Sequence, residues 1–308
     1  MDEFMRKVQD RRIDSKYSLV RKLGEGGFGA VYLGRDFDTG EEVALKLEHR
    51  DQCPSILEEE VETYATFQGL PGFPEVYWYG WQDDYKVMVF ELLGPSLEDL
   101  FVFCGRRFSL KTTIMIMDQL LLRLEALHSK GLLHRDVKPQ NCLLGNGTNG
   151  NVVYVTDFGL AQEYAAKFDD FKEFPGRRSR LVGTARYASI RGHSGQVQSP
   201  GDDLESLGYM MIYFMRGGLP WQGLKAHSRE EKDWLVKEKK IALGIEELCS
   251  GLPEEFAEYM RLVKSVQQEP VPNYTTLRDL FGRVARREAI EYDSVFDWTV
   301  RLYLQRAE

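Results

Sequence analysis

Paired cysteines are missing from this sequence of 308 residues, and their absence excludes two kinds of scaffold. The four cysteines lie far apart and form no Cys-x-x-Cys pair: Cys53, Cys104, Cys142 and Cys249. A disulfide framework or a structural zinc site is therefore not expected, and reduced thiols are the default. We accordingly expect a cytoplasmic protein, with the nucleus as a second compartment.

Long apolar runs are missing as well. No stretch approaches the roughly 18 apolar residues that cross a bilayer. Residues 1–14 carry charges of both signs and lack the apolar centre of a secretory signal. The chain also has no internal repeats and no low-complexity tails. We therefore expect a globular protein without membrane insertion. We also expect a monomer.

The charge balance is negative, with 40 basic and 48 acidic residues and a net charge of −8. This balance argues against nucleic acid as the main partner. One stretch runs against it, because no acidic residue lies between Glu173 and Asp202. The same stretch contains five arginines: Arg177, Arg178, Arg180, Arg186 and Arg191.

Hydrophobic periodicity divides the chain near Gly94. Before it, one helix is predicted over 55–68, and strands are predicted over 17–23, 30–34, 42–47 and 85–92. After it, helices are predicted over 96–103, over 112–129 and from 202 nearly to the end, with short strands at 142–144 and 152–156. The pattern predicts an α+β fold with a small β-rich N-lobe over 17–93 and a larger, mostly helical C-lobe over 94–300. Residues 1–16 and 301–308 are left as flanking segments.

A glycine-rich segment, Gly24-Glu25-Gly26-Gly27-Phe28-Gly29, follows the first predicted strand. Glycines let the backbone approach phosphate oxygens, because no Cβ stands in the way. A dinucleotide-binding fold would need a helix after the glycines. Here the next residues alternate like a strand and turn back at Asp38-Thr39-Gly40. This order favours a strand-loop-strand flap over phosphates.

Lys46 ends the run Val43-Ala44-Leu45-Lys46, which matches the lysine-bearing strand of protein kinases. Such a lysine holds the α- and β-phosphates of ATP when a glutamate from the next helix pairs with it. The spacing leaves four candidates for that glutamate: Glu58, Glu59, Glu60 and Glu62.

The strongest motif is His134-Arg135-Asp136-Val137-Lys138-Pro139-Gln140-Asn141, with Asp157-Phe158-Gly159 sixteen residues after its last member. In this pattern Asp136 can accept the proton of a substrate hydroxyl and align it for attack. Asn141 and Asp157 offer oxygen ligands of the kind that Mg²⁺ prefers. Lys138 resembles the lysine that steadies the transferred phosphate in serine/threonine kinases.

Asp203 lies at a predicted helix start and resembles the kinase aspartate that binds the backbone of the catalytic loop. A simpler reading is an acid in the first helical turn, and both can hold.

Several further blocks resemble the casein kinase 1 family over roughly residues 15–300. The usual Ala-Pro-Glu of kinases is replaced by Gly183-Thr184-Ala185-Arg186-Tyr187-Ala188-Ser189-Ile190, as in that family. Other matching blocks are 93–101, 202–209, 218–225 and Phe296-Asp297-Trp298. The sequence departs from the family at 191–199 and at Pro200-Gly201, where two arginines are usual.

The resemblance implies a bilobal serine/threonine protein kinase that uses ATP and Mg²⁺. Asp136, Lys138 and Lys46 would be catalytic, and Asn141 and Asp157 would bind the metal. Alignment favours Glu60 as the partner of Lys46. The ATP site would comprise Leu23, Gly24, Gly26, Gly29, Val31, Ala44, Lys46, Glu60, Phe90, Glu91, Leu93 and Leu144.

The resemblance also implies an anion site that selects acidic or phosphate-primed protein substrates. Arg186 and Lys225 match the family positions, and Arg178 and Arg180 flank Ser179, where the family has a third basic residue. Arginine forks pair well with phosphate or carboxylate.

Two other functions stay open. One is a pseudokinase scaffold that binds nucleotide without turnover. The other is a phosphotransferase acting on small molecules.

Overall fold

The computed structural model describes residues 12–26, 29–52, 55–164, 181–265 and 272–307. The chain divides into two compact units, each described below by itself. The first unit comprises residues 1–94 and 144–159, and the second comprises residues 95–143 and 160–308.

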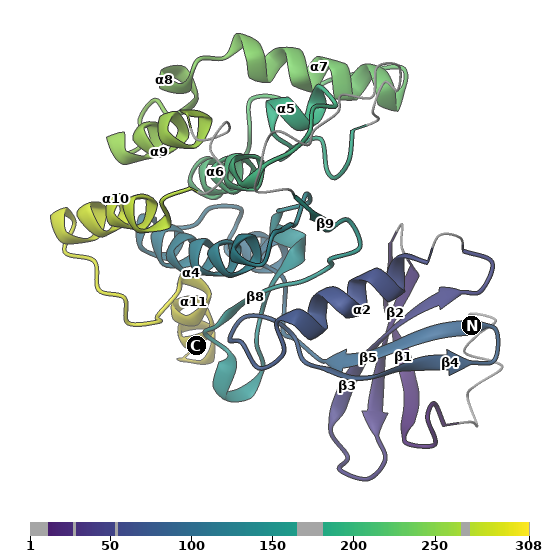
Figure 1. The fold of residues 1–308 in the computed structure, drawn as a ribbon. Coiled ribbons are helices and arrows are strands. Elements are labelled where there is room, and N and C mark those ends of the chain that lie inside the picture. The colour runs from purple at the N-terminus through teal and green to yellow at the C-terminus, as the bar shows by residue number, and fades with distance from the viewer. Residues whose placement is uncertain (1–11, 27–28, 53–54, 165–180, 266–271, 308) are drawn as a thin grey trace. The chain divides into compact units, whose positions relative to one another are not determined.

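A five-stranded antiparallel sheet in the order β1-β2-β3-β5-β4 is the centre of the first unit (Figure 1). Its strands are β1 (Tyr17–Gly26), β2 (Gly29–Asp36), β3 (Glu42–His49), β4 (Val76–Gln82) and β5 (Tyr85–Glu91). Helix α2 (Ile56–Thr66) packs against β4 and β5. It buries Leu57, Glu60 and Tyr64, which recur at helical spacing and so share one side of the helix.

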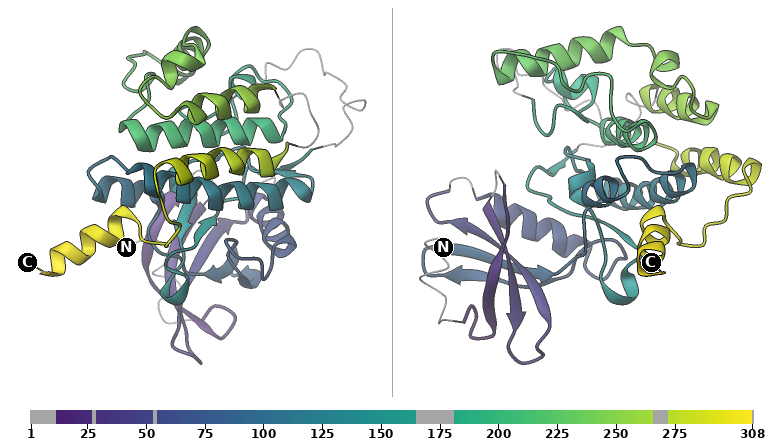
Figure 2. Two further views of the ribbon diagram at one scale, coloured as in Figure 1. Left: turned by 90° about the vertical axis from the view of Figure 1, so that its left-hand side faces the viewer. Right: turned by 180° about the vertical axis from the view of Figure 1, so that it is seen from behind.

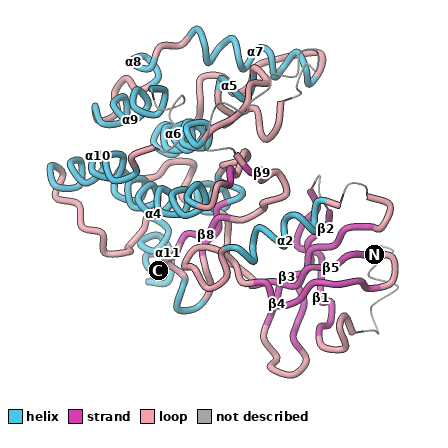
Figure 3. The backbone as a smooth tube through the Cα atoms, viewed as in Figure 1, coloured by secondary structure: helices cyan, strands magenta, loops and turns pink. Residues whose placement is uncertain are grey.

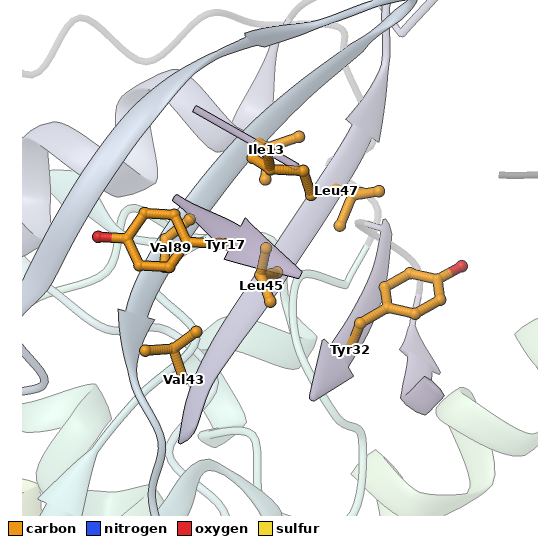
Figure 4. Close-up of a cluster of buried hydrophobic side chains, with 8 residues drawn as sticks. Ile13, Tyr17, Tyr32, Val43, Leu45, Leu47 and Val89 are labelled. Carbon is orange, nitrogen blue, oxygen red and sulfur yellow. The ribbon is translucent and has the colours of Figure 1, made fainter. Parts of the chain in front are cut away.

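The opposite face of the sheet carries a hydrophobic cluster, drawn in Figure 4. Side chains alternate along a strand, so Leu45 and Leu47 of β3 point away from the face that bears Lys46. Ile13, which precedes β1, is 1% exposed and belongs to this cluster. Its N–H and C=O both bond to Tyr17. The segment before β1 is therefore part of the core of this unit.

The second unit is mostly helical, as the colouring in Figure 3 shows. Its helices are α3 (Leu97–Phe103), α4 (Leu110–Ser129), α5 (Ile190–His193), α6 (Pro200–Arg216), α7 (Arg229–Ala242), α8 (Ile245–Leu248), α9 (Glu254–Ser265), α10 (Tyr274–Arg287) and α11 (Asp297–Ala307). Within this unit α4 packs against α6 and α10, and α9 packs against α6 and α10 (Figure 2).

Short elements complete the described structure. Two-stranded ribbons pair β6 (Leu132–Leu133) with β9 (Gln162–Glu163), and β7 (Cys142–Leu144) with β8 (Val153–Val155). Single 3₁₀ turns are η1 (Pro139–Asn141) and η2 (Gly147–Asn149).

Helix α6 is buried on all sides over residues 200–214, as expected of a central helix. Its start is specified locally: Ser199 and Asp202 form a capping box, and Pro200 occupies a position where no N–H is needed. Its end is Gly217, with φ +85°. The departure from the family at Pro200-Gly201 is therefore compatible with a regular helix start.

The predicted α+β kinase fold is confirmed. The sequence analysis predicts no strand at β4. A register shift between Val76 and Trp78 interrupts the alternation of inward and outward side chains there. Helix α4 begins earlier than the apolar period indicates, because the side chain of Ser109 caps it at the N–H of Thr112.

We expect the Ile13→Ala substitution to lower the free energy of unfolding of the chain by about 2 to 4 kcal/mol, because it leaves a cavity in the sheet cluster. Val20→Ala is the control, since Val20 in β1 is 45% exposed and its truncation should change stability by at most about 0.5 kcal/mol. Urea unfolding monitored by tryptophan fluorescence measures both. Equal, small effects of the two substitutions would show that the segment before β1 does not stabilise the sheet.

Candidate active site

The ammonium of Lys46 lies between two carboxylates of the first unit. Its Nζ is 2.6 Å from Oε2 of Glu60 and 3.0 Å from Oδ1 of Asp157. The side chains of Lys46 and Glu60 are only 9% and 1% exposed. Burial alone lowers the pKa of this ammonium, but the two carboxylates outweigh burial and the pKa of Lys46 is raised. Lys46 therefore carries a fixed positive charge in the interior.

Of the four glutamates that the spacing allows, the structure pairs Glu60 with Lys46. Glu60 shares the buried side of α2 with Leu57 and Tyr64. Glu58 instead forms an ion pair of 2.6 Å with Lys86. The other two glutamates, at 59 and 62, are exposed.

Asp157 is held by its backbone as well as by Lys46. Its N–H donates to the hydroxyl of Tyr64 at 3.0 Å, and its φ of +66° lies in the left-handed region that disfavours most side chains. The next residue, Phe158, is 2% exposed and packs edge-on against Tyr64, with ring centroids 4.9 Å apart. It also stacks on Phe67 and Phe73. The aromatic cluster thus fixes where the Asp157 carboxylate points.

The glycine-rich segment joins β1 and β2, with Gly24 opposite Val31 and Gly26 opposite Gly29. A strand-loop-strand arrangement is thereby confirmed, and the dinucleotide-binding alternative fails because no helix follows. Open space surrounds the position that a Cβ on Gly24 would take. A Cβ on Gly29 would lie 2.2 Å from the carbonyl oxygen of Leu47, so that glycine is needed for the sheet itself.

The remaining residues proposed for the ATP site also belong to the first unit. Val31 of β2 pairs with Lys46 of β3, and Ala44 of β3 pairs with Phe90 of β5. The Phe90 and Tyr64 rings stack at 6.2 Å. Beyond Phe90 the chain continues through Glu91 and Leu93 to Gly94, whose N–H donates to the carbonyl of Leu144 at 2.8 Å. Leu23, on β1, is 41% exposed.

The second unit contains Asp136, whose two carboxylate oxygens differ. Oδ2 accepts from Nζ of Lys138 at 2.5 Å and from the amide nitrogen of Asn141 at 3.4 Å. Oδ1 is buried and has no hydrogen-bond partner among the described residues. A buried carboxylate oxygen without a donor is costly, so this atom is suited to accept a hydrogen bond from a bound molecule.

The loop that carries Asp136 is held by Asp203 of α6. The Asp203 carboxylate accepts from the backbone N–H groups of His134 and Arg135, at 2.8 Å each, and lies 2.9 Å from Nε2 of His128. Burial alone raises the pKa of Asp203, but these contacts outweigh burial and the pKa is lowered. The predicted contact with the loop backbone is confirmed, and Asp203 is also an acid of the first helical turn.

A close backbone approach joins this loop to the segment that follows. Gly183 has φ +86°, and a Cβ there would lie 2.5 Å from the carbonyl oxygen of Arg135. The next side chain, Thr184, accepts a hydrogen bond from Nζ of Lys138 at 3.2 Å. Lys138 is thus fixed between Asp136 and Thr184.

Only half of the predicted anion site can be placed. Arg178 and Arg180 lie outside the described residues. The guanidinium of Arg186 lies 5.8 Å from the ring of Tyr187 and 5.9 Å from that of Tyr213. Lys225 is exposed.

A buried lysine supports the segment from Ala185 to Ala188, and the sequence analysis did not predict a role for it. Nζ of Lys240, in α7, donates to the carbonyls of Ala185 at 2.9 Å and Ala188 at 2.6 Å. It lies over the rings of Tyr209 and Trp221, at 4.7 and 5.0 Å. Burial lowers its pKa to about 7. Its position in the run Lys237-Glu238-Lys239-Lys240 resembles a solvated helix face, so only the helical spacing from buried Val236 could have indicated burial.

The donor set fits a nucleotide with a divalent cation. In the first unit, Lys46 would offer a cation to phosphate and the Asp157 carboxylate would offer a hard oxygen ligand, and in the second unit the amide of Asn141 would offer another. No group of three or more His, Cys, Asp or Glu side chains in the described part of the chain could hold a metal ion alone.

Together the strand-rich unit with its buried lysine and the helical unit with its aspartate loop define a phosphotransferase of the kinase class. The sequence profile of the protein kinase domain matches residues 17–269. The chain therefore belongs to the protein kinase domain family, whose members bind ATP and protein substrates. Among the residues described, no helix is long and apolar enough to cross a membrane.

We expect His193 to make stability depend on pH between about 6.5 and 4. Its Nε2 lies 3.0 Å from the carbonyl of Ala185 and 3.3 Å from Nζ of Lys240. Burial, and then the charges of Lys240 and Lys237, lower the pKa of His193 to about 4. The unfolded chain binds this proton near pH 6.5, so between the two values it holds more protons than the folded chain. The free energy of unfolding therefore falls as pH falls through this window.

Urea unfolding at pH 7 and pH 4.5 measures this effect in wild type and in His193→Gln. The loss of stability on acidification should be smaller in the variant, because it lacks the His193 contribution. Carboxylates that titrate in the same range are present in both proteins and contribute equally. His227→Gln, at an exposed histidine, should behave like wild type. Identical pH dependence in all three proteins would contradict the assignment.

Proposed function

We propose that this chain is a serine/threonine protein kinase of the casein kinase 1 type, transferring the γ-phosphoryl group of ATP to serine or threonine hydroxyls. The observation that carries the proposal is the Asp136 carboxylate: its Oδ1 is buried without a hydrogen-bond partner among the described residues, and its Oδ2 accepts from Lys138. Oδ1 of this carboxylate can take up the proton of a substrate hydroxyl while Lys138 faces the phosphate.

The chain's own residues would act as follows. Oδ1 of Asp136 accepts the proton of the substrate hydroxyl as its oxygen attacks phosphorus. Lys138, fixed by Asp136 and Thr184, stabilises negative charge on the transferred group. The ATP–Mg²⁺ complex supplies the phosphoryl group. Lys46 would bind its phosphates, and Asn141 and Asp157 would hold the metal ion. ADP would be the leaving group, because the bond between the γ-phosphorus and the bridging oxygen breaks as the new bond forms.

The base of ATP would lie beside Ala44 and Phe90, with the backbone of Glu91 and Leu93 reading its edge. The remaining contacts would come from the flap and the strand behind it: Leu23, Gly24, Gly26, Gly29, Val31 and Leu144. In this proposal residues 17–93 act as the N-lobe and residues 94–300 as the C-lobe, with short flanking segments.

Specificity for serine and threonine is proposed from Lys138. Its compact charge occupies the space beside Asp136 that the ring of a tyrosine substrate would need. The lysine is held there by two hydrogen bonds, to Asp136 and Thr184, so it is not free to swing away.

A preference for acidic or phosphate-primed substrates is proposed from the basic stretch. Arg186 is half-buried between two tyrosine rings, which orients its guanidinium, and Lys225 is exposed. Arg178 and Arg180 would complete the site. Arg191, in contrast, donates to the carbonyl of Val197 at 2.8 Å and lies 3.8 Å from Asp202, so it has a structural task.

A pseudokinase scaffold is the alternative. It would be expected to have lost Lys46, Asp136, Asn141 or Asp157, and all four are present. A monomeric, cytoplasmic or nuclear protein that does not bind nucleic acid stays our prediction.

The Asp136→Asn substitution should lower kcat by about 10² to 10⁴-fold and leave the fold intact, because an amide cannot take up the proton. Steady-state phosphorylation of an acidic peptide measures it. Asp279→Asn, at an exposed aspartate of α10, is the control and should retain wild-type kcat. Near-normal turnover by the Asp136 variant would exclude Asp136 as the base.

The Arg186→Ala, Lys225→Ala double variant should lose the preference for a peptide with phosphoserine N-terminal to the target serine. We expect kcat/KM for the primed peptide to fall about three- to tenfold while kcat/KM for the unprimed peptide changes little. The wild-type preference should fade as ionic strength rises, because exposed charges drive it. An equal priming preference in both enzymes would place the anion site elsewhere.

A further inference from the structure

We propose that Glu48, two residues beyond the catalytic lysine on β3, is a positioning residue that sets α2 so that Glu60 meets Lys46. The inference rests on the proposed kinase function and adds a residue to it. None of the sequence motifs includes Glu48.

Glu48 caps the start of α2 from the neighbouring strand. Its Oε1 accepts from the backbone N–H of Ile56 at 2.9 Å and of Leu57 at 3.1 Å. Its Oε2 accepts from the hydroxyl of Ser55 at 2.6 Å. Glu48 is 2% exposed. Three donors at a helix N-terminus compensate a buried carboxylate well, because the helix dipole also favours negative charge there.

The usual capping residue does not cap this helix. Ser55 occupies the N-cap position, yet its side chain accepts no hydrogen bond from the first turn. It donates to Glu48 instead. The first backbone donors of α2 are thus satisfied by a strand residue, so the helix start is tied to β3 rather than to its own preceding loop.

Strand β3 therefore holds α2 at two points. Lys46 and Glu48 are two residues apart and point to the same face of the sheet. Lys46 binds Glu60, and Glu48 binds the backbone one turn earlier, at Leu57. A lysine–glutamate pair has many rotatable bonds and tolerates several helix positions. Hydrogen bonds to backbone N–H groups fix the helix itself.

A third attachment comes from β5. Glu48 lies opposite Lys86 across β3 and β5. Nζ of Lys86 donates to Oγ of Ser55 at 3.1 Å and to Oε2 of Glu58 at 2.6 Å. The lysine thus holds both the N-cap residue and an acid of the first turn. Its positive charge also lies close to Glu48 through the shared Ser55, which reduces the cost of burying that carboxylate.

A structural role alone would predict that loss of Glu48 weakens the fold and nothing more. A positioning role predicts that its effect on catalysis passes through the Lys46–Glu60 pair. The two are separated by a double-mutant cycle between Glu48 and Glu60, because residues acting through one another are not additive.

The experiment measures kcat and KM for ATP and for an acidic peptide, together with thermal stability, in five proteins. They are wild type, Glu48→Ala, Glu60→Gln, the combination of both, and Glu62→Ala as an exposed control on α2. We expect Glu48→Ala to lower kcat by about 10- to 100-fold with the peptide KM little changed, since a displacement of about 1 Å can cost this much. In the Glu60→Gln background the same change should lower kcat little further. Glu62→Ala should match wild type.

Glu48→Gln guards against simple loss of folding, because its amide oxygen can still accept from both N–H groups. It should keep kcat within a few-fold of wild type and well above Glu48→Ala. Equal losses of kcat from Glu48→Ala in both backgrounds, or an unchanged kcat in Glu48→Ala and Glu48→Gln, would overturn the positioning role. Absence of activity in wild type under the same conditions would instead overturn the proposed kinase function.

Discussion

The burial of one ammonium group, that of Lys46, is the constraint on which the first unit depends. A buried cation is tolerated only when anions compensate the lost hydration, and here Glu60 and Asp157 do so at 2.6 and 3.0 Å. Each anion must itself be held. Glu60 is held by α2, whose first backbone N–H groups bond to Glu48. Asp157 is held by its backbone, which Tyr64 and the Phe158 cluster support.

The second unit buries an anion where the first unit buries a cation. Asp203 is a buried anion, and it is compensated by two backbone N–H groups and a histidine rather than by a lysine. Because those N–H groups belong to the loop that carries Asp136, the hydrogen bonds to Asp203 also hold Asp136 in place. The buried amino group of Lys240 likewise holds the segment from Ala185 to Ala188, through hydrogen bonds to its carbonyl groups, and lies over aromatic rings. Buried charge in this chain thus organises loops that have little apolar surface of their own.

The sequence predicted the fold correctly. It also marked the residues of the two motifs as candidates, because their chemistry leaves few alternatives, and their roles stay predictions. An aspartate followed by lysine and asparagine at fixed spacing, with Asp-Phe-Gly beyond, has one common use. The supporting residues were not predictable in the same way. Glu48 and Lys240 are charged side chains, and their residue type assigns them to solvent; only the helical spacing of Lys240 from Val236 indicated otherwise. Their burial follows from which elements pack together.

Ile13 illustrates the same limit for an apolar residue. It lies in a charged segment without periodicity, so nothing local indicates that it enters the sheet cluster. The choice among four glutamates was also open until α2 was placed, although the helical spacing of Leu57, Glu60 and Tyr64 held the information. For the anion site, Arg186 and Lys225 could be located, whereas Arg178 and Arg180 lie outside the described residues.

The most direct test of this account is phosphoamino-acid analysis of an acidic protein substrate incubated with labelled ATP and Mg²⁺, using wild type and Lys46→Met side by side. The account predicts label on phosphoserine and phosphothreonine with wild type and almost none with the variant, while both proteins remain folded. Label mainly on phosphotyrosine would contradict the role given to Lys138, and equal labelling by the two proteins would contradict the central place given to Lys46.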